Sequence, residues 1–172
     1  MKLMYSRPIL RDLSQGSRIA FVRQLRLKSQ DEVAKELGID SYTRRRTVTR
    51  YEKGDRNPLE KRARKIAEIL DVNYQAIKVY DYKEPLDFIF TLLWLEELLP
   101  NYHIDLSDVK VMDDEFLKIV ETFLKEWEKV KLKRKNNQMK YAEYIEWKLN
   151  YSLGGESNEW YQNYKYKRYW SI

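Results

Sequence analysis

Along the first 80 positions, hydrophobic residues recur with the period of amphipathic α-helices. Apolar side chains recur three and four positions apart, which places them on one face of a helix, and polar residues fill the other positions. The pattern breaks at short intervals, so it predicts five short helices in this part of the chain. They are residues 17–26, the segment from Ser29 to Gly38, residues 45–53, residues 58–70, and "DVNYQAIKVY" with Asn73 as its N-cap.

Several of these helix ends carry residues that satisfy the free backbone groups there. In "SQDE", Ser29 and Glu32 have the spacing of a capping box, in which each side chain accepts a hydrogen bond from the other residue's backbone amide. Gly38 and Gly54 follow the second and third segments, where glycine readily takes the left-handed conformation that ends a helix. Pro58 is expected to begin the fourth helix, because proline suits the first helical position.

The second half of the chain predicts longer and more apolar helices. Residues 86–99 are apolar on almost every face, which indicates a buried helix. Residues 113–133 carry a seam that faces another helix, of this chain or of a partner. The seam consists of Phe116, Val120, Phe123, Trp127 and Val130. "MKYAEYIEWKLNY" predicts a further helix that ends at "LGG". Aromatic residues at helical spacing usually fill a core, and that interpretation is favoured here.

Composition agrees with a mostly α fold in two parts. Charged residues make up 35% and hydrophobic residues 43% of the chain, with only 5 Gly and 4 Pro, which is typical of a globular helical protein. We expect a five-helix domain over residues 1–82, with its core in 16–80, and a helical, aromatic-rich domain over residues 83–172. In the tail 156–172, packing of the aromatic residues is favoured over stacking on single-stranded bases.

Charge is distributed unevenly between these two parts. Residues 1–80 contain 19 Lys and Arg against 10 Asp and Glu, a net +9, whereas residues 81–172 contain 14 against 17, a net −3. Of the 24 aromatic residues, 18 follow residue 80, including all five Trp. A basic domain is the usual electrostatic footprint of a polyanionic partner. Nucleic acid is therefore the first partner to consider for the N-terminal part.

The residue types argue against most catalytic and metal-binding chemistry. The chain has no cysteine and one histidine, His103, which excludes disulfides and a His/Cys zinc site. It shows no glycine-rich phosphate loop and no nucleophile motif, so no cofactor and no metal site are assigned. One acidic cluster leaves a metal-dependent nuclease as a less favoured alternative: Asp105, Asp108, Asp113, Asp114 and Glu115. Without a signal peptide or a membrane-spanning run, a cytoplasmic protein is expected.

A set of features, taken in order, resembles the helix-turn-helix regulators of the Cro and phage-repressor type, the xenobiotic-response-element-like group. The features are Ile19 and Arg23, "SQDEVAKELG" at 29–38, "TVTRYEKG" at 47–54, Pro58, and "KIAEILDV" at 65–72. The resemblance covers residues 16–80. It implies a five-helix, repressor-like DNA-binding domain whose third helix lies in the major groove of double-stranded DNA.

The resemblance also implies roles for individual residues. Aligned on Val48 and Glu52, the positions that read bases are Arg45, Arg46, Thr49 and Arg50. Contacts to the DNA backbone are expected from Gln30, Arg44, Lys53, Arg56 and Asn57. Arg23 and Glu52 are expected to pair across the core and to act structurally.

Two departures from the family pattern affect this site. Nine residues separate Gly38 from Val48, more than the family usually has, and the extra residues lie within "DSYTRRRT". They either lengthen the recognition helix by a turn or form a basic loop ahead of it. Lys28 occupies a position that is usually apolar, which predicts an altered turn between the first two helices.

These features together predict a sequence-specific DNA-binding regulator of transcription, of bacterial or phage type, without enzymatic activity. Regulators of this type usually bind in pairs on neighbouring half-sites. The apolar surplus after Leu86 predicts a homodimer held by the C-terminal part. The alternative for that part is an antitoxin-like arrangement, in which it binds a protein partner.

Overall fold

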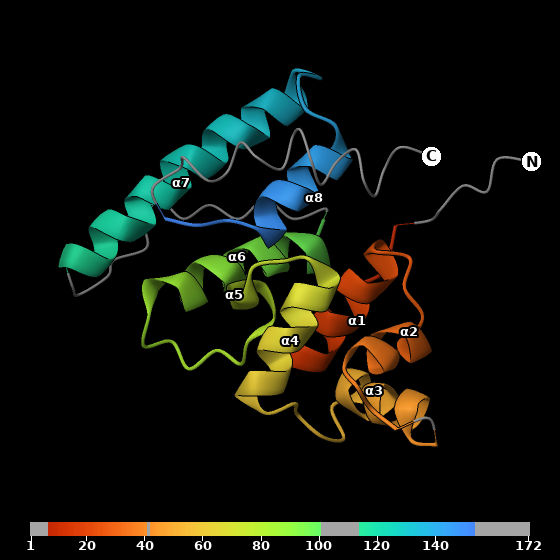
Figure 1. Cartoon of the computed structure of the whole chain (residues 1–172). Coiled ribbons are helices and arrows are strands. Elements are labelled where there is room, and N and C mark those ends of the chain that lie inside the picture. The colour runs from red at the N-terminus through yellow and green to blue at the C-terminus, as the bar shows by residue number, and fades with distance from the viewer. Residues whose placement is uncertain (1–6, 41, 101–113, 154–172) are drawn as a thin grey trace, which may run out of the picture. The chain divides into compact units, whose positions relative to one another are not determined.

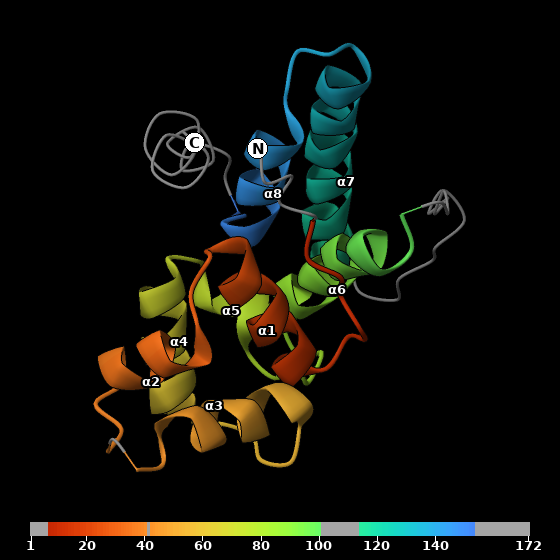
Figure 2. The ribbon, with the colours of Figure 1, turned by 90° about the vertical axis from the view of Figure 1, so that its right-hand side faces the viewer.

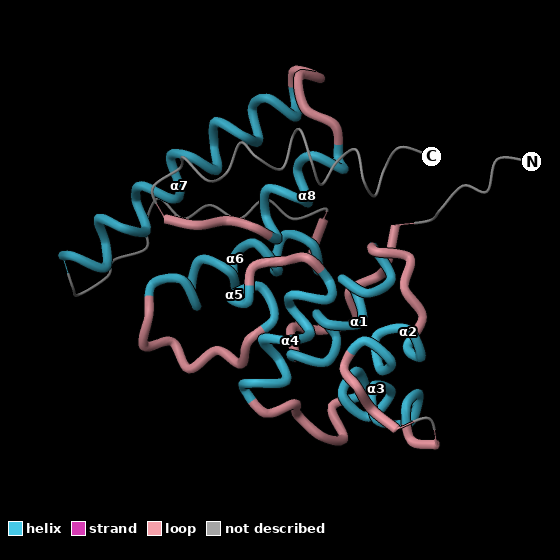
Figure 3. Tube along the Cα trace, in the orientation of Figure 1, coloured by secondary structure: helices cyan, strands magenta, loops and turns pink. Residues whose placement is uncertain are grey.

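The computed structural model describes residues 7–40, 42–100 and 114–153, and every regular element within those ranges is an α-helix (Figure 3). The mostly α fold class is thereby confirmed. The chain divides into two compact units: the first holds α1 to α5, and the second holds most of α6 together with α7 and α8. The helices are α1 (Gln15–Leu25), α2 (Gln30–Glu36), α3 (Arg44–Lys53), α4 (Glu60–Leu70), α5 (Tyr74–Ile77), α6 (Pro85–Leu98), α7 (Asp114–Lys135) and α8 (Tyr141–Leu149).

In the first unit, a single apolar core joins all five helices. α2 and α3 pack side by side, and α1 packs against α3 and α5 (Figures 1 and 2). Each helix contributes at least one side chain that is almost fully buried: Ile19, Val22, Val33, Val48, Ile66, Leu70 and Ile77. Burying one such aliphatic side chain stabilises a fold by ~1.5–3 kcal/mol. The periodic apolar positions of the sequence thus become the core that positions α3.

The helix ends of the first unit follow the local signals in the sequence. The Ser29 hydroxyl accepts from the Glu32 amide at 3.1 Å, and the Glu32 carboxylate accepts from the Ser29 amide at 2.6 Å, which completes the capping box. The hydrogen bond from the Ser29 backbone lowers the pKa of the Glu32 carboxyl group. Gly38 and Gly54 have φ angles of 70° and 80°, the left-handed conformation expected after α2 and α3.

Several helix ends differ from the sequence prediction, and those of α4 and α8 have a visible physical reason. α4 begins at Glu60, two residues after Pro58, because Leu59 keeps an extended backbone (φ −59°, ψ 155°) and serves as the N-cap. α8 ends at Leu149 and does not reach "LGG". The Asn150 amide group donates to the Glu146 carbonyl at 3.0 Å, which satisfies one of the free acceptors at that helix end.

In the second unit, the predicted seam of α7 is used within the chain itself. Phe123 is fully buried and Trp127 is 4% exposed, while Phe116 is half-buried. The Phe123 ring lies 5.2 Å, centroid to centroid, from the rings of both Trp127 and Tyr151. The sequence left open whether this seam packs on a helix of this chain or on a partner. In the structure, it packs on the α8 region of the same chain.

A chain of polar contacts also links the three helices of the second unit. Trp127 Nε1 donates to the Tyr144 hydroxyl at 2.7 Å, and that hydroxyl donates to Glu96 Oε2 at 2.6 Å. Lys148 Nζ, whose side chain is 3% exposed, forms an ion pair with the same Glu96 oxygen at 2.8 Å. Buried polar groups are stable only when they are paired in this way, so the network fixes how α7 and α8 pack on α6.

Some sequence predictions lie outside the described residues. They are the roles considered for His103, Asp105, Asp108, Asp113 and the tail 156–172. Among the helices of the described ranges, none is long and apolar enough to span a membrane.

Candidate nucleic-acid interface

The three consecutive arginines form the first turn of α3. The helix begins at Arg44, so Arg45 and Arg46 are helical as well. Arg44 Nε donates to the Ile39 carbonyl at 3.0 Å, which ties the start of α3 to the end of the preceding turn. The sequence left open whether the inserted residues lengthen the recognition helix or form a basic loop ahead of it. In the structure, the three arginines belong to the helix.

α3 has one buried and one exposed face. Val48, Tyr51 and Glu52 are 1%, 1% and 6% exposed and face the core. With about 3.6 residues per turn, two of the positions predicted to read bases, Arg46 and Arg50, lie on the opposite side. Of the four predicted positions, three are exposed and Thr49 is half-buried; the exposed ones are Arg45, Arg46 and Arg50. Arg46 and Arg50 thus lie opposite the buried side of α3, Thr49 lies at its flank, and Arg45 is exposed at the edge nearest Glu52.

Gln30 connects the start of α2 to this face. Its Nε2 donates to Glu52 Oε2 at 2.7 Å, and the Thr49 hydroxyl lies 2.9 Å from its Oε1. The same hydroxyl lies 2.7 Å from the Arg45 carbonyl, so its proton already has acceptors within the protein. The Gln30 amide is held by α3 through both of its ends. The methyl group of Thr49 is the part that suits contact with a thymine.

Arg23 and Glu52, which the sequence pairs, lie together in the structure. Arg23 Nε and Nη2 donate to the two Glu52 carboxylate oxygens at 2.5 and 3.0 Å. Arg23 Nη1 donates to the Lys28 carbonyl at 2.8 Å, and the Lys28 ammonium pairs with Glu36 at 2.6 Å. Lys28 is thus accommodated in the turn by directing its charge outward, while Arg23 and Glu52 join α1 to the end of α3.

Comparison with known proteins agrees with this geometry. The helix-turn-helix family model matches residues 19–77, which include most of α1 and all of α2 to α5. Residues 19–77 are a DNA-binding helix-turn-helix of the Cro and phage-repressor type. No family model matches the C-terminal half. Comparisons with curated proteins and with solved structures gave no significant match.

The family is one of DNA-binding proteins that are typically not enzymes. Within the part of the chain that the structure describes, no group of three or more His, Cys, Asp and Glu side chains is arranged to hold a metal ion.

The remaining backbone-contact candidates of the helix-turn-helix lie at the two ends of α3. Arg44 is half-buried at its start, and Lys53 is its last residue. Arg56 and Asn57 follow in the next turn, and both are exposed. The Arg56 amide donates to the Arg50 carbonyl at 3.3 Å, which holds that turn against α3. Cations are thus available beside the base-reading face at each end.

Two arginines of the first unit that the sequence left unassigned are structural. Arg18 is 2% exposed and donates to the carbonyls of Ala76 and Lys78 at 3.0 and 2.8 Å. Arg26 is 4% exposed and donates to the Leu70 carbonyl at 2.8 Å. Both guanidinium groups satisfy free carbonyls at helix C-termini, where the helix dipole favours a cation. The net +9 of residues 1–80 therefore overstates the charge that faces a polyanion.

Proposed function

We propose that the chain is a transcriptional regulator that recognises specific sites in double-stranded DNA. The observation that carries this proposal is the exposed basic surface of α3: Arg45, Arg46 and Arg50 are all exposed, and Arg46 and Arg50 lie opposite the buried side of the helix. A recognition helix places its N-terminal residues at base edges in the major groove. Such a helix gains nothing in stability from adjacent exposed arginines, since like charges repel, so a polyanion is the partner that this face suits.

The proposed readout divides the side chains into two groups. Arginine binds guanine O6 and N7 through two parallel hydrogen bonds, so Arg45, Arg46 and Arg50 would select guanines, and the Thr49 methyl would select a thymine. Phosphate contacts fix the register without reading sequence. That role falls to Gln30, Arg44, Lys53, Arg56 and Asn57.

Selection of binding sites from random DNA tests this proposal, and variants of the basic face test its residues. Changing Arg46 to alanine should remove ~1–3 kcal/mol of discrimination at one or two base pairs, because a bidentate base contact is lost. Changing Lys53 to alanine should instead weaken binding to all DNA sequences alike. It should also reduce the slope of log affinity against log salt by ~0.9. Dissociation constants on the selected and on a scrambled duplex, at two salt concentrations, separate the two effects.

The matched control is Arg64→Ala, which removes one positive charge from the same unit at an exposed position of α4 that pairs with Glu60 at 2.7 Å. It should leave base preference unchanged. If Arg45, Arg46 and Arg50 variants all lose equal affinity on the selected and scrambled duplexes, these arginines do not read bases and the assignment fails.

We further propose that the regulator acts as a homodimer held by residues after Leu86. One helix-turn-helix contacts few base pairs, and pairing on half-sites ~34–36 Å apart extends the recognised sequence. Because the α7 seam is buried within the chain, the pairing surface has to come from other residues. Within residues 87–100 and 114–153, the large apolar side chains that are exposed are Leu99, Leu132 and Leu153, at 37%, 54% and 44% exposure.

Sedimentation of the intact chain at micromolar concentration should therefore show a species of about twice 21.1 kDa. A fragment of residues 1–82 should sediment as a monomer and bind a full site much more weakly, because the second half-site no longer adds to the affinity. Its base preference should be unchanged. A 21.1 kDa species of the intact chain, together with a selected site that lacks two-fold symmetry, would contradict the homodimer. It would favour the antitoxin-like alternative, in which the C-terminal part binds a protein partner.

A further inference from the structure

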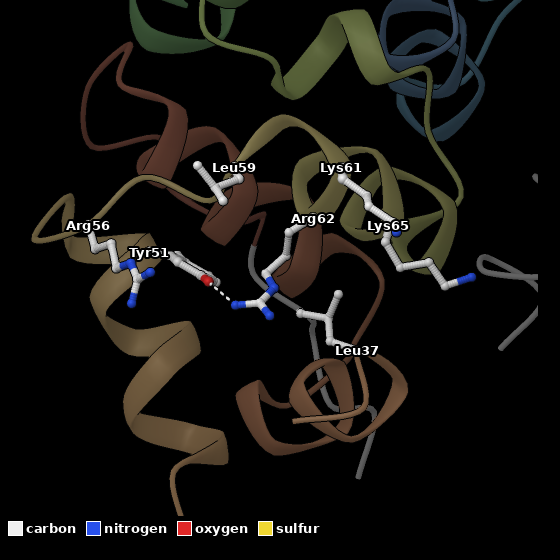
Figure 4. Close-up of a pocket in the computed structure, with 7 residues that line it drawn as sticks. All are labelled: Leu37, Tyr51, Arg56, Leu59, Lys61, Arg62 and Lys65. Atoms are coloured by element: carbon white, nitrogen blue, oxygen red, sulfur yellow. Dashed lines mark hydrogen bonds between the residues drawn. The ribbon is translucent and has the colours of Figure 1, made fainter. Parts of the chain in front are cut away.

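A second basic site lies in the first unit, away from the base-reading residues. A pocket of about 470 Å³ opens between the end of α2, the end of α3 and the start of α4 (Figure 4). Its size is within the ~300–1,000 Å³ of small-molecule sites. Tyr51 lines it, and two positions along α3 turn the helix by about 200°, so Tyr51 leaves α3 on nearly the opposite side from Thr49. Leu37 lines it from the C-terminal end of α2, the end remote from Gln30.

The charged residues that line this pocket are all cations. They are Arg56, Lys61, Arg62 and Lys65. Lys65 pairs with Glu68 at 2.8 Å, and Arg62 Nη1 donates to the Tyr51 hydroxyl at 2.8 Å, as Figure 4 shows. Among the described residues, Arg56 and Lys61 have no side-chain partner. No carboxylate of the described ranges lines this pocket, so its cations repel each other and create a positive potential. A bound anion would reduce that repulsion.

The pocket also has an apolar wall, which a free inorganic anion would not need. Leu59 is 77% exposed, although it is a large aliphatic residue at the N-cap of α4, where a polar residue is usually preferred. Leu37 is half-buried across the pocket, and the Tyr51 ring is 1% exposed between α3 and the core. An apolar group bound between the leucines would cover them, while the cations hold a charged group beside it.

We propose that this pocket binds a diffusible phosphate monoester that carries a compact ring. The phosphoryl group, with a charge of about −1.5 to −2 at neutral pH, lies among Arg56, Lys61 and Arg62. Arg62 offers two parallel hydrogen bonds to its oxygens, and the Tyr51 hydroxyl positions that guanidinium. The ring packs on Leu37 and Leu59. The site shares Arg56 with the proposed DNA backbone contacts but contains none of the base-reading residues, so binding of the ligand without DNA tests it separately from the proposed function.

Calorimetric titration of the intact protein without DNA tests the site, with phenyl phosphate and inorganic phosphate as the two probes. Phenyl phosphate should bind about tenfold or more tightly than inorganic phosphate, because only it covers the leucines. The variant Lys61→Gln/Arg62→Gln should bind phenyl phosphate about tenfold or more weakly, because charge-assisted hydrogen bonds are lost. Both side chains are exposed, and circular dichroism checks that the fold is kept when Arg62 no longer donates to the Tyr51 hydroxyl.

Two further variants make the test specific. Arg64→Gln, on the same helix but outside the pocket and paired with Glu60, should bind phenyl phosphate as the unchanged protein does. Leu59→Ser introduces a residue that suits the N-cap position, and it should reduce the affinity for phenyl phosphate to that for inorganic phosphate. Equal losses in Arg64→Gln and in the double variant would show a diffuse cation effect and overturn the proposal.

DNA backbone phosphate is the other source of the same chemistry, and duplex binding distinguishes it. For a site of diffusible ligands, Lys61→Gln/Arg62→Gln should leave the slope of log duplex affinity against log salt nearly unchanged, because neither residue then contacts a DNA phosphate. A slope reduced by ~0.9 for each lost cation, with no preference for phenyl phosphate over inorganic phosphate, would make the pocket a DNA backbone clamp and overturn the proposal.

Discussion

Replacing Glu52 with alanine should lower the free energy of unfolding by roughly 3 kcal/mol, near the lower end of the ~3–5 kcal/mol that breaking a buried ion pair costs. The Glu52 carboxylate accepts two hydrogen bonds from Arg23 and one from Gln30. Its removal leaves the Arg23 side chain, 13% exposed, with the Lys28 carbonyl as its remaining acceptor among the described residues. Urea unfolding followed by circular dichroism measures the loss.

A double-mutant cycle isolates the pair from the packing around it. Arg23→Ala should cost a similar amount, because it leaves the Glu52 carboxylate buried without its two strongest donors. The double variant should cost less than the sum of the single variants, since neither charge is then stranded. Glu60→Ala is the matched control: its partner Arg64 is exposed, and exposed pairs contribute ~0.2–1 kcal/mol. Additive losses at Arg23 and Glu52 would contradict the coupling.

The parts of the fold that the sequence predicted correctly are those governed by short-range interactions. The capping box at Ser29 and Glu32 lies within four residues, and the left-handed residues Gly38 and Gly54 need no distant partner. The apolar period of α1 and α4 gave the correct core positions, because a helix face follows from spacing alone. These local signals agree with one another, which is why the family pattern was visible in a single sequence.

The features that the sequence did not predict depend on distant partners or on missing local signals. Arg26 looks like one more surface cation, yet its acceptor at Leu70 is 44 residues away. The start of α3 was ambiguous because the N-cap Thr43 makes no side-chain capping bond, so nothing local marks the boundary. The pocket beside Tyr51 combines residues from three helices, and no spacing rule brings Leu37 and Arg62 together.

Replacing Gly16 with alanine should be as costly as losing Glu52, for a steric reason. A Cβ atom at Gly16 would lie 2.2 Å from the Tyr51 carbonyl oxygen and 2.8 Å from that of Glu52. Both acceptors belong to the backbone near the end of α3, and Glu52 O is also held by Arg11 Nη2 at 3.0 Å. Such a contact has to push α3 away from α1. We expect a loss of about 3 kcal/mol, the upper end of the usual cost of overpacking, in thermal unfolding.

Gly38→Ala separates this steric effect from the backbone cost of replacing a glycine. Gly38 has a φ of 70° but open space where a Cβ would lie, so alanine there should cost ~1–2 kcal/mol from the left-handed backbone alone. Only Gly16→Ala should also weaken DNA binding in the fraction that stays folded, because it displaces the recognition helix. If Gly16→Ala instead stabilises the protein by ~1 kcal/mol, as alanine does at an unconstrained helical position, α1 and α3 do not approach as closely as described.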